Sequence, residues 1–285
     1  MTRHPIYQIT SIGRPVEPQY PTNKAVIILL PVAGIVAALF AYLVSSEHSI
    51  TALLGTVMYS MLVTFGAWAL ARELAPDDNP AAFICMVLAF LVYLLSPGSS
   101  ILLLFVALAL SRILNRSTGL APRMSDSLVV TLLAGWAAYS LDSPLIAAVA
   151  ALVFILDTML AGPEKRQWPF AIFSLVIVVI LTIQHGLILE LPALPAAADD
   201  LLTPLVLLVF ILSVVSMKTV ESAGDIDGKP LLLNRVRWGM IAVLLLAAIF
   251  LFTGPGHAAT AALLVATMAG IPAGGVLRNL RNLHR

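Results

Sequence analysis

The chain alternates between long, uninterrupted apolar stretches and short polar segments. Three of the stretches, residues 25–46, 50–71 and 170–189, contain no Lys, Arg, Asp or Glu. Each has about the 20 residues that a helix needs to cross a bilayer. A membrane β-barrel would instead show strands of about 10 residues with alternating apolar and polar positions. Helices and closed barrels are the structures that satisfy every backbone hydrogen bond inside a membrane, so the pattern predicts an all-α transmembrane helical bundle.

The same pattern predicts about ten spans in a single transmembrane domain, residues 25–277. An N-terminal tail (1–24) and a basic C-terminal tail (278–285) flank this domain. The third and fourth spans are separated by Pro97-Gly98-Ser99-Ser100, so they form either one kinked helix or a hairpin of two. The predicted spans are residues 25–46, 50–71, 81–96, 99–114, 125–141, 143–161, 170–189, 201–217, 238–254 and 257–277.

The composition excludes several classes of protein. Charged residues make up 11% of the chain and hydrophobic residues 60%, whereas an ordinary soluble domain has about 25% charged residues. A chain of 285 residues has too little interior to hide that much apolar surface from water. A soluble enzyme, a disordered chain and a free-standing nucleic-acid-binding protein are therefore excluded.

The distribution of charge predicts an orientation. With ten spans, all 16 lysines and arginines fall on one side of the membrane. Lys and Arg in short loops resist translocation, so this side and both termini are expected in the cytoplasm. Merging the third and fourth spans would separate Arg72 from Arg112, which favours the hairpin. We expect a multi-pass protein of the bacterial inner membrane that contacts anionic lipid headgroups. The acidic residues expected on the outer side are Glu47, Asp142, Glu190, Asp199 and Asp200.

The central parts of the predicted helices are nearly free of charge, and Asp157 is the clear exception. It lies five residues before Gly162, about one and a half turns from the cytoplasmic end of its span. A carboxylate inside a membrane is costly and is often retained for function, so Asp157 is a candidate catalytic residue. The alternative is a partly solvated carboxylate that pairs with Arg or Lys near the helix end.

A second group of acidic residues follows the eighth predicted span, where Asp225 and Asp227 are further candidate catalytic residues. If the helix continued, Glu221 and Asp225 would share a face and repel each other, unless a cation or a basic residue offset the charge. A helix end near Ser222 would also remove the conflict. Carboxylates beside basic residues at a membrane surface suit Mg²⁺ and a phosphate group, although Asp-Gly is also ordinary in turns. The candidate metal ligands are Glu73, Asp77, Glu221 and Asp225.

Basic residues on the same side form candidate phosphate-binding or substrate-binding positions. Arg112 and Arg116 are four residues apart and share a helix face. Arg123 follows them, and Lys218 precedes the acidic loop. Arginines can hold a phosphorylated substrate through paired hydrogen bonds. The alternative is that these residues set the topology and attract anionic lipid headgroups.

Part of the acidic loop resembles a known motif. Asp225-Ile226-Asp227-Gly228 is similar to part of the second aspartate-rich motif of the UbiA-type prenyltransferases. Glu73 and Asp77 lie roughly where the first motif of that family would be. The resemblance implies Mg²⁺ held by two cytoplasmic acidic motifs and a prenyl diphosphate substrate. The sequence departs from the family pattern because no Asn-Asp pair opens the first motif and Lys229 replaces an expected Asp.

Three functions are compatible with these features. A membrane-embedded transferase would act on a lipid or isoprenoid phosphate at a polar site facing the cytoplasm. Ten spans with both ends inside are also the plan of drug/metabolite-type transporters, which move small solutes. A scaffold or complex subunit without catalysis would use its basic face to dock a soluble partner. The convergence of acidic and basic residues on one side favours the transferase.

Overall fold

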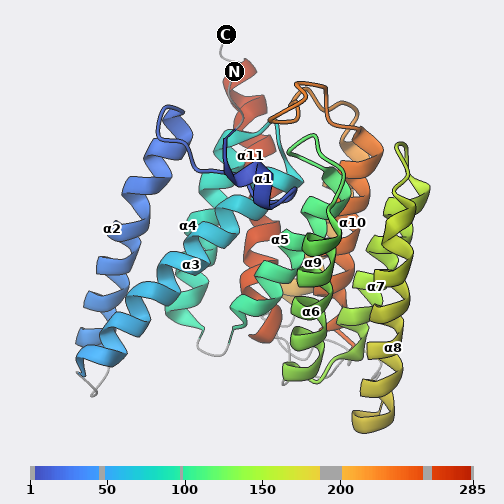
Figure 1. Ribbon diagram of the computed structural model, residues 1–285. Helices are drawn as coiled ribbons and strands as arrows, with labels where there is room; N and C mark the ends of the chain where they lie inside the picture. Colours follow the sequence, from blue (N-terminus) through green and yellow to red (C-terminus); the bar gives the residue numbers. More distant parts are fainter. Residues whose placement is uncertain (1–3, 45–48, 97–98, 187–200, 253–258, 284–285) are drawn as a thin grey trace.

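The computed structural model describes residues 4–44, 49–96, 99–186, 201–252 and 259–283. Its regular elements are helices, and the described residues contain no strand beyond one isolated β-bridge between Ala223 and Pro230. The helices are α1 (Ile6–Ile9), α2 (Pro21–Val44), α3 (Ile50–Leu74), α4 (Asn79–Leu95), α5 (Ile101–Asn115), α6 (Met124–Ser140), α7 (Pro144–Met159), α8 (Trp168–His185), α9 (Leu202–Ser216), α10 (Leu233–Ile249) and α11 (Ala262–Leu283), with a short 3-10 helix at Lys165–Gln167 (Figure 1).

The predicted helices are confirmed, because each of the ten predicted spans coincides with one helix from α2 to α11. The alternative of one continuous helix is wrong, since α4 and α5 are separate helices. Among the described residues, four helices are long and apolar enough to cross a membrane. They are Pro21–Val44, Ile50–Leu74, Lys165–Gln184 and Ala259–Leu277. Helix length therefore supports a membrane protein, while the total of ten spans stays a prediction.

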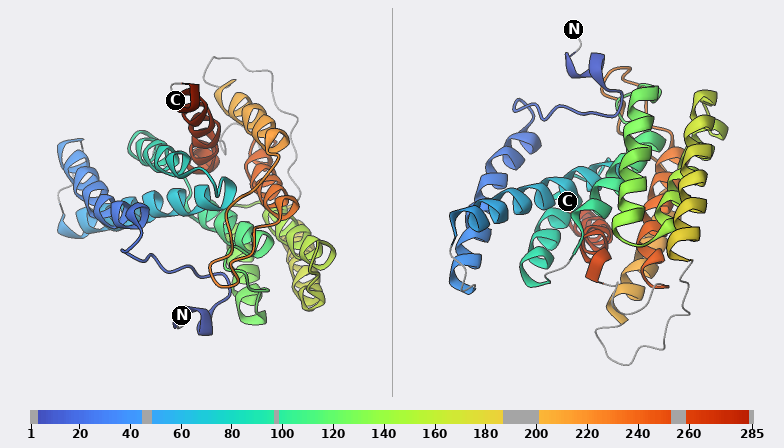
Figure 2. Two further views of the ribbon diagram at one scale, coloured as in Figure 1. Left: turned by 90° about the horizontal axis from the view of Figure 1, so that it is seen from above. Right: turned by 60° about the horizontal axis from the view of Figure 1, so that its bottom comes forward.

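Helix α5 lies at the centre of the bundle and contacts α3, α6, α7, α10 and α11. Its first ten residues are all apolar, as expected for a helix surrounded by other helices. Viewed from the end that carries α1, α2 and the beginning of α3 extend to one side, and α8 lies on the opposite side (Figure 2). Helix α2 packs chiefly against α3 and only weakly against α4. It is thus the outermost helix on its side.

Helices α4 and α11 approach closely because α11 presents two glycines to α4. A Cβ on Gly270 would come within 2.7 Å of the backbone nitrogen of Cys85, and a Cβ on Gly274 within 2.4 Å of the Cβ of Ala81. The spacing of the two glycines is the Gly-x-x-x-Gly pattern that allows close helix packing in membranes. The thiol of Cys85 donates to the carbonyl of Thr267 at 3.0 Å across the same interface.

The outer faces of α2, α8 and α9 expose many large apolar side chains. Ile35 on α2 is 67% exposed, Ile183 on α8 is 79% exposed and Val215 on α9 is 70% exposed. Soluble monomers rarely expose continuous apolar surfaces of this size. In a bilayer the same faces lie against lipid chains, so the exposed surface agrees with the helix lengths in indicating a membrane protein.

The polar loops gather at one end of the bundle, which we call the α1 end. The loops after α3, α5, α7 and α9 all lie there, next to α1 and the last turns of α11 (Figure 1). Asp142 lies in the turn between α6 and α7, at the opposite end. Glu47, Glu190, Asp199 and Asp200 lie outside the described residues. The predicted tails overlap helices, because α2 already begins at Pro21 and α11 runs to Leu283.

We expect the two ends of the bundle to lie on opposite sides of the membrane. Cys85 is the single cysteine and is buried, so maleimide labelling of a variant reports on the introduced cysteine. In intact cells, a membrane-impermeant maleimide should label Ser140→Cys and spare Thr219→Cys, because basic loops stay in the cytoplasm. In inverted membrane vesicles, the maleimide should label Thr219→Cys and spare Ser140→Cys. Labelling of both positions from one side would contradict the orientation.

Candidate functional site

Residues 4–20, here called the N-terminal segment, are attached to the α1 end of the bundle. The anchor is Ser11, which is 2% exposed and donates its backbone N–H to the Oδ2 of Asp126 at 2.6 Å. Its hydroxyl also donates to Asp126 and accepts the backbone N–H of Arg123 at 2.9 Å. The hydroxyl of Thr118 donates to the Ser11 carbonyl at 2.5 Å. The predicted N-terminal tail is therefore a docked part of the structure.

Arg123, a predicted phosphate-binding residue, contributes to this attachment. Its Nη2 donates to the carbonyl of Tyr7 at 2.9 Å, and its Nη1 donates to the carbonyl of Gln8. Both carbonyls belong to the N-terminal segment. Arg123 does not line the pocket described next.

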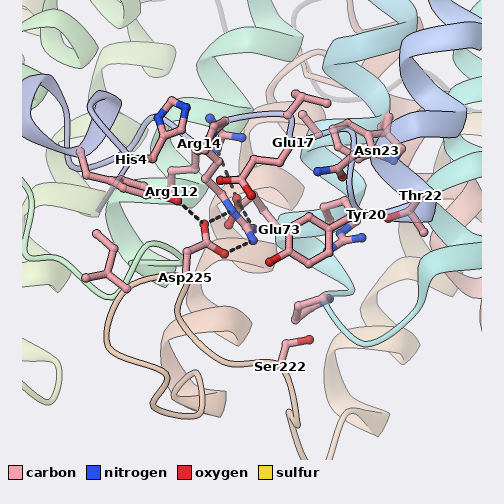
Figure 3. A pocket seen from close by; sticks show the side chains of 18 of the residues that line it. His4, Arg14, Glu17, Tyr20, Thr22, Asn23, Glu73, Arg112, Ser222 and Asp225 are labelled. Atoms are coloured by element: carbon pink, nitrogen blue, oxygen red, sulfur yellow. Dashed lines mark hydrogen bonds and ion pairs between the residues drawn. The ribbon is translucent and has the colours of Figure 1, made fainter. Parts of the chain in front are cut away.

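A polar pocket of about 960 Å³ lies between the N-terminal segment and the bundle (Figure 3). Its wall includes the first residues of α2, the last turns of α3 and one residue of α5. The loop between α9 and α10, residues 217–232, completes the wall. The pocket thus combines segments that are far apart in the chain, at the level where α2 and α3 reach the α1 end.

Arg14 joins two carboxylates in this pocket. Its Nε donates to the Oδ2 of Asp225 at 2.8 Å and its Nη2 to the Oδ1 at 2.7 Å, which makes a bidentate pair. Its Nη1 lies 3.6 Å from the Oε1 of Glu73. Figure 3 shows these three side chains pointing toward one another. The Arg14 and Asp225 side chains are 23% and 25% exposed, so this pair stays in contact with solvent.

Glu73 is the buried carboxylate of the pocket, with 1% of its surface exposed. Its Oε1 accepts the Nε of Arg112 at 3.2 Å and the hydroxyl of Ser117 at 3.0 Å, and its Oε2 accepts the Nδ2 of Asn115 at 3.3 Å. Arg112 also donates to the carbonyl of Ile12 in the N-terminal segment at 3.1 Å. A buried charge needs this number of donors to offset its lost hydration. Glu73 is consequently a residue that holds the pocket together.

The two polar groups of the N-terminal segment that face Asp225 have shifted pKa values. Burial, with the neighbouring charge of Asp225, raises the pKa of the Tyr7 phenol to about 12. The phenol therefore stays protonated at neutral pH and donates to the Oδ2 of Asp225 at 3.2 Å. Burial alone would lower the pKa of Arg14, but the carboxylates of Glu73 and Asp225 outweigh burial and raise that pKa.

Arg72 is the arginine of the pocket without an ion pair among the described residues. Its Nη1 donates to the Oδ1 of Asn79 at 2.5 Å. The charge of Arg14 repels it, while the carboxylates of Glu73 and Asp225 attract it. Trp68, one helical turn earlier on α3, also lines the pocket and is 7% exposed. Its indole N–H has no acceptor among the described residues. Of these two groups, the partly exposed Arg72 can donate to an anion that enters the pocket, whereas the indole nitrogen of Trp68 is buried.

Asp157 belongs to a second ion cluster. It is fully buried and accepts the Nη2 of Arg116 at 2.8 Å and 2.9 Å and the Nη1 of Arg235 at 2.7 Å. The two arginines also donate to backbone carbonyls, Arg116 to Gly162 at 2.8 Å and Arg235 to Leu114 at 3.0 Å. The cluster joins the ends of α5 and α7 to α10. No member of it lines the pocket.

The loop between α9 and α10 is shaped by the other predicted acidic residues. Helix α9 ends at Ser216, so Glu221 and Asp225 do not share a helix face. Asp77 accepts the backbone N–H groups of Glu221 and Ser222 at 2.9 Å and 2.7 Å and thereby fixes the loop to the turn between α3 and α4. Asp227 accepts the backbone N–H of Lys229 at 3.2 Å within a turn. Lys218 is exposed on this loop and lies outside the pocket wall.

The predicted magnesium ligands do not converge. In the part of the chain that is described, no three His, Cys, Asp or Glu side chains are grouped so that they could hold a metal ion. Glu73 and Asp225 both line the pocket, but each is paired with arginine, and Asp77 and Glu221 do not line it. The residues present therefore do not fit a Mg²⁺ site built from these four side chains.

Of the residues predicted from the sequence, the pocket brings together Arg112, Glu73 and Asp225. It does not include Asp157, Asp227, Arg116, Arg123, Lys218, Asp77 or Glu221. The sequence reasoning missed Tyr7, Arg14, Trp68 and Arg235 as site residues, and it used Arg72 only to decide the topology. An Arg-Glu pair at the end of α3, Arg72-Glu73, was the available signal, because two opposite charges end an otherwise apolar helix there.

Comparison with protein-family models, with curated proteins and with solved structures finds no match for this chain. The resemblance to the prenyltransferase motif therefore depends on a few loop residues alone. The structure uses Asp227 of that motif in a turn, and it directs Asp225 toward Arg14. Function must be argued from the pocket itself.

The cluster around Asp157 should be important for stability. Asp157→Asn leaves the buried Arg235 and the partly buried Arg116 without a carboxylate, and breaking a buried pair costs about 3 to 5 kcal/mol. The melting temperature of the purified protein in detergent should fall by several degrees. Glu164→Gln is the matched control, because Glu164 pairs with the exposed Arg166 and its loss should change melting little. Equal melting of the two variants would contradict the structural role of Asp157.

Proposed function

We propose that the chain is a multi-pass protein of the bacterial inner membrane with its α1 end in the cytoplasm. The exposed apolar faces of α2, α8 and α9 support membrane insertion. The basic loops at the α1 end support the orientation, because such loops resist translocation. Under this proposal the pocket opens at the cytoplasmic surface, close to the lipid headgroups.

We further propose that the pocket binds the phosphorylated headgroup of an amphipathic substrate. The observation that carries this proposal is Arg72, a guanidinium in an open pocket that has no ion pair among the described residues. Arg14 and Arg112 line the same wall, where their charges are paired with Asp225 and Glu73. Guanidinium groups bind phosphate oxygens through strong, directed hydrogen bonds.

The position of the pocket favours an amphipathic ligand over a fully water-soluble one. Tyr20 and Phe65 line it together with the first residues of α2. Just beyond them, Ile28 on α2 is 56% exposed on the face that lies against lipid under this proposal. A headgroup in the pocket would leave its hydrocarbon chains beside α2, in the bilayer.

The activity that we propose for this pocket is transfer of a group to or from a lipid or isoprenoid phosphate. Of the three predicted catalytic carboxylates, only Asp225 lines the pocket, so it is the candidate general base. Tyr7, protonated at neutral pH, is the candidate hydrogen-bond donor beside it. Glu73 and Asp157 are assigned to structure, because their oxygens are occupied by buried donors.

Transport is the second candidate, and one observation favours it. A second cavity of about 430 Å³ borders the other ends of α2 and α3, between Ala37 and Val44 of α2 and near Tyr59 of α3. Two cavities at opposite ends of the same helix pair would suit a transporter that exposes its solute to one side of the membrane and then to the other. Protection of a cysteine placed at Ala41 by a transported solute would favour this function over the transferase.

The binding proposal predicts that Arg72→Gln weakens the binding of phosphatidic acid. Removing the unpaired guanidinium removes a charge-assisted contact, so the dissociation constant should rise by about tenfold. Native mass spectrometry of the detergent-solubilised protein, titrated with phosphatidic acid, measures this change. Arg166→Gln is the control, because Arg166 lies on the same end of the bundle but outside the pocket. Equal effects of the two variants would show that lipid binds to the basic surface in general.

A further inference from the structure

The charged side chains that line the pocket balance one another. They are three arginines and three carboxylates, namely Arg14, Arg72, Arg112, Glu17, Glu73 and Asp225. With His4 counted as neutral, their formal charges sum to zero. Binding sites and their partners carry complementary charge, so a pocket for a purely anionic ligand would have an excess of positive charge. The balance favours a ligand that carries charges of both signs.

Ion pairs within the wall leave one charge of each sign without such a partner. The pairs are Arg14–Asp225 at 2.7 Å and Arg112–Glu73 at 3.2 Å. Among the described residues, neither Arg72 nor Glu17 forms an ion pair, since Arg72 donates to the amide oxygen of Asn79 and Glu17 accepts the side-chain amide of Gln19. One guanidinium and one carboxylate therefore remain available to a charged ligand.

Glu17 is accessible from the pocket. It is partly exposed and lies in the N-terminal segment just before α2, where its carbonyl accepts the backbone N–H of Tyr20 at 3.2 Å. Its charge acts within the pocket, because burial is the largest cause of the raised pKa of Tyr7 and the charge of Glu17 adds to it. Arg72 lies on α3, so a ligand that contacts both residues extends between two segments of the wall. The volume of about 960 Å³ is in the range of small-molecule sites.

We infer that the headgroup bound in this pocket is zwitterionic, with a phosphate diester at Arg72 and a protonated primary amine at Glu17. This inference rests on the proposed binding of a phosphorylated headgroup and names its chemical class. A primary alkyl amine has a pKa near that of Lys, about 10.4, and is therefore protonated at neutral pH. Its N–H groups donate charge-assisted hydrogen bonds to a carboxylate.

A phosphate diester without the amine binds less well in the same pocket. Its phosphate gains the same contact with Arg72, but Glu17 keeps its charge unpaired and repels the net negative charge of the lipid. Because Glu17 is partly exposed, solvent screens these effects. The preference for the amine is therefore modest, about threefold to fivefold in the dissociation constant.

The test is a calorimetric titration of the full chain in detergent with two short-chain lipids, dihexanoyl phosphatidylethanolamine and dihexanoyl phosphatidylglycerol. Both carry a singly charged phosphate diester, and the first lipid alone has an amine. The wild type should bind phosphatidylethanolamine about threefold to fivefold more tightly. Glu17→Gln should weaken the binding of phosphatidylethanolamine, strengthen that of phosphatidylglycerol and so remove most of the preference.

Two variants control for this change. Glu17→Asp keeps the charge at this position and should keep most of the preference for the amine. Glu164→Gln removes a carboxylate from the same end of the bundle but outside the pocket, so it should leave both dissociation constants unchanged.

A soluble probe separates a lipid from a free metabolite as the source of the headgroup. Free phosphoethanolamine has the same two charged groups but no hydrocarbon chains, so it should bind more weakly than the lipid. Equal affinity would retain the recognition of the amine and overturn a lipid as its source.

The inference is overturned if the wild type binds both lipids equally, or if Glu17→Gln leaves their ratio unchanged. Failure of the binding proposal itself is distinguishable, because both lipids share the phosphate. Arg72→Gln should weaken both by a similar factor, and binding of both lipids that is indifferent to Arg72→Gln would contradict the proposed phosphate site.

Discussion

The carboxylate of Glu73 is the interaction on which the α1 end of the molecule depends. A charge buried at the end of an apolar helix must be surrounded by donors, because an unpaired charge in this position would cost several kcal/mol. The donors come from Arg112 and Asn115 on α5 and from Ser117 in the following loop. Arg14 in the N-terminal segment adds an ion pair at 3.6 Å. One carboxylate therefore holds α3, α5 and residues 4–20 in a fixed arrangement and leaves a pocket between them.

The chain places its polar chemistry at one end for a physical reason. The helix centres lie in an apolar environment where a charged side chain is expensive. Both ion clusters accordingly lie where helices end, one around Glu73 and one around Asp157. They differ in accessibility, since the cluster at Asp157 is closed by backbone carbonyls while the cluster at Glu73 continues into the exposed pair of Arg14 and Asp225. The cluster at Asp157 is therefore closed to ligands, whereas the cluster at Glu73 borders the pocket for which we propose ligand binding.

Much of the fold follows from local properties of the sequence. Apolar runs interrupted by prolines and polar turns predicted α2 to α11, because a helix in a membrane satisfies its own hydrogen bonds and needs no distant partner. The pairing of charges depends on tertiary structure instead. Arg235 meets Asp157 across 78 positions, and Arg14 meets Asp225 across 211 positions. No periodicity within one helix contains that information.

Two features of the site could not be settled from the sequence, for identifiable reasons. The sequence left open whether a helix continues through Glu221 and Asp225, and α9 in fact ends at Ser216, after which the loop is shaped by backbone contacts to Asp77. Residues 1–24 were treated as a tail because they lack an apolar pattern, yet Ser11 and Arg14 dock them through hydrogen bonds and ion pairs. Polar docking of this kind leaves no hydrophobic signature in the sequence.

The central claim is that the pocket beside Glu73 receives a phosphorylated lipid headgroup. A structure determined by cryo-electron microscopy in nanodiscs that contain phosphatidic acid tests it most directly. The account predicts density for the phosphate within hydrogen-bond distance of Arg72, with Glu73 still bound to Arg112. A pocket without lipid density, while phosphatidic acid is resolved elsewhere on the basic loops, would contradict it.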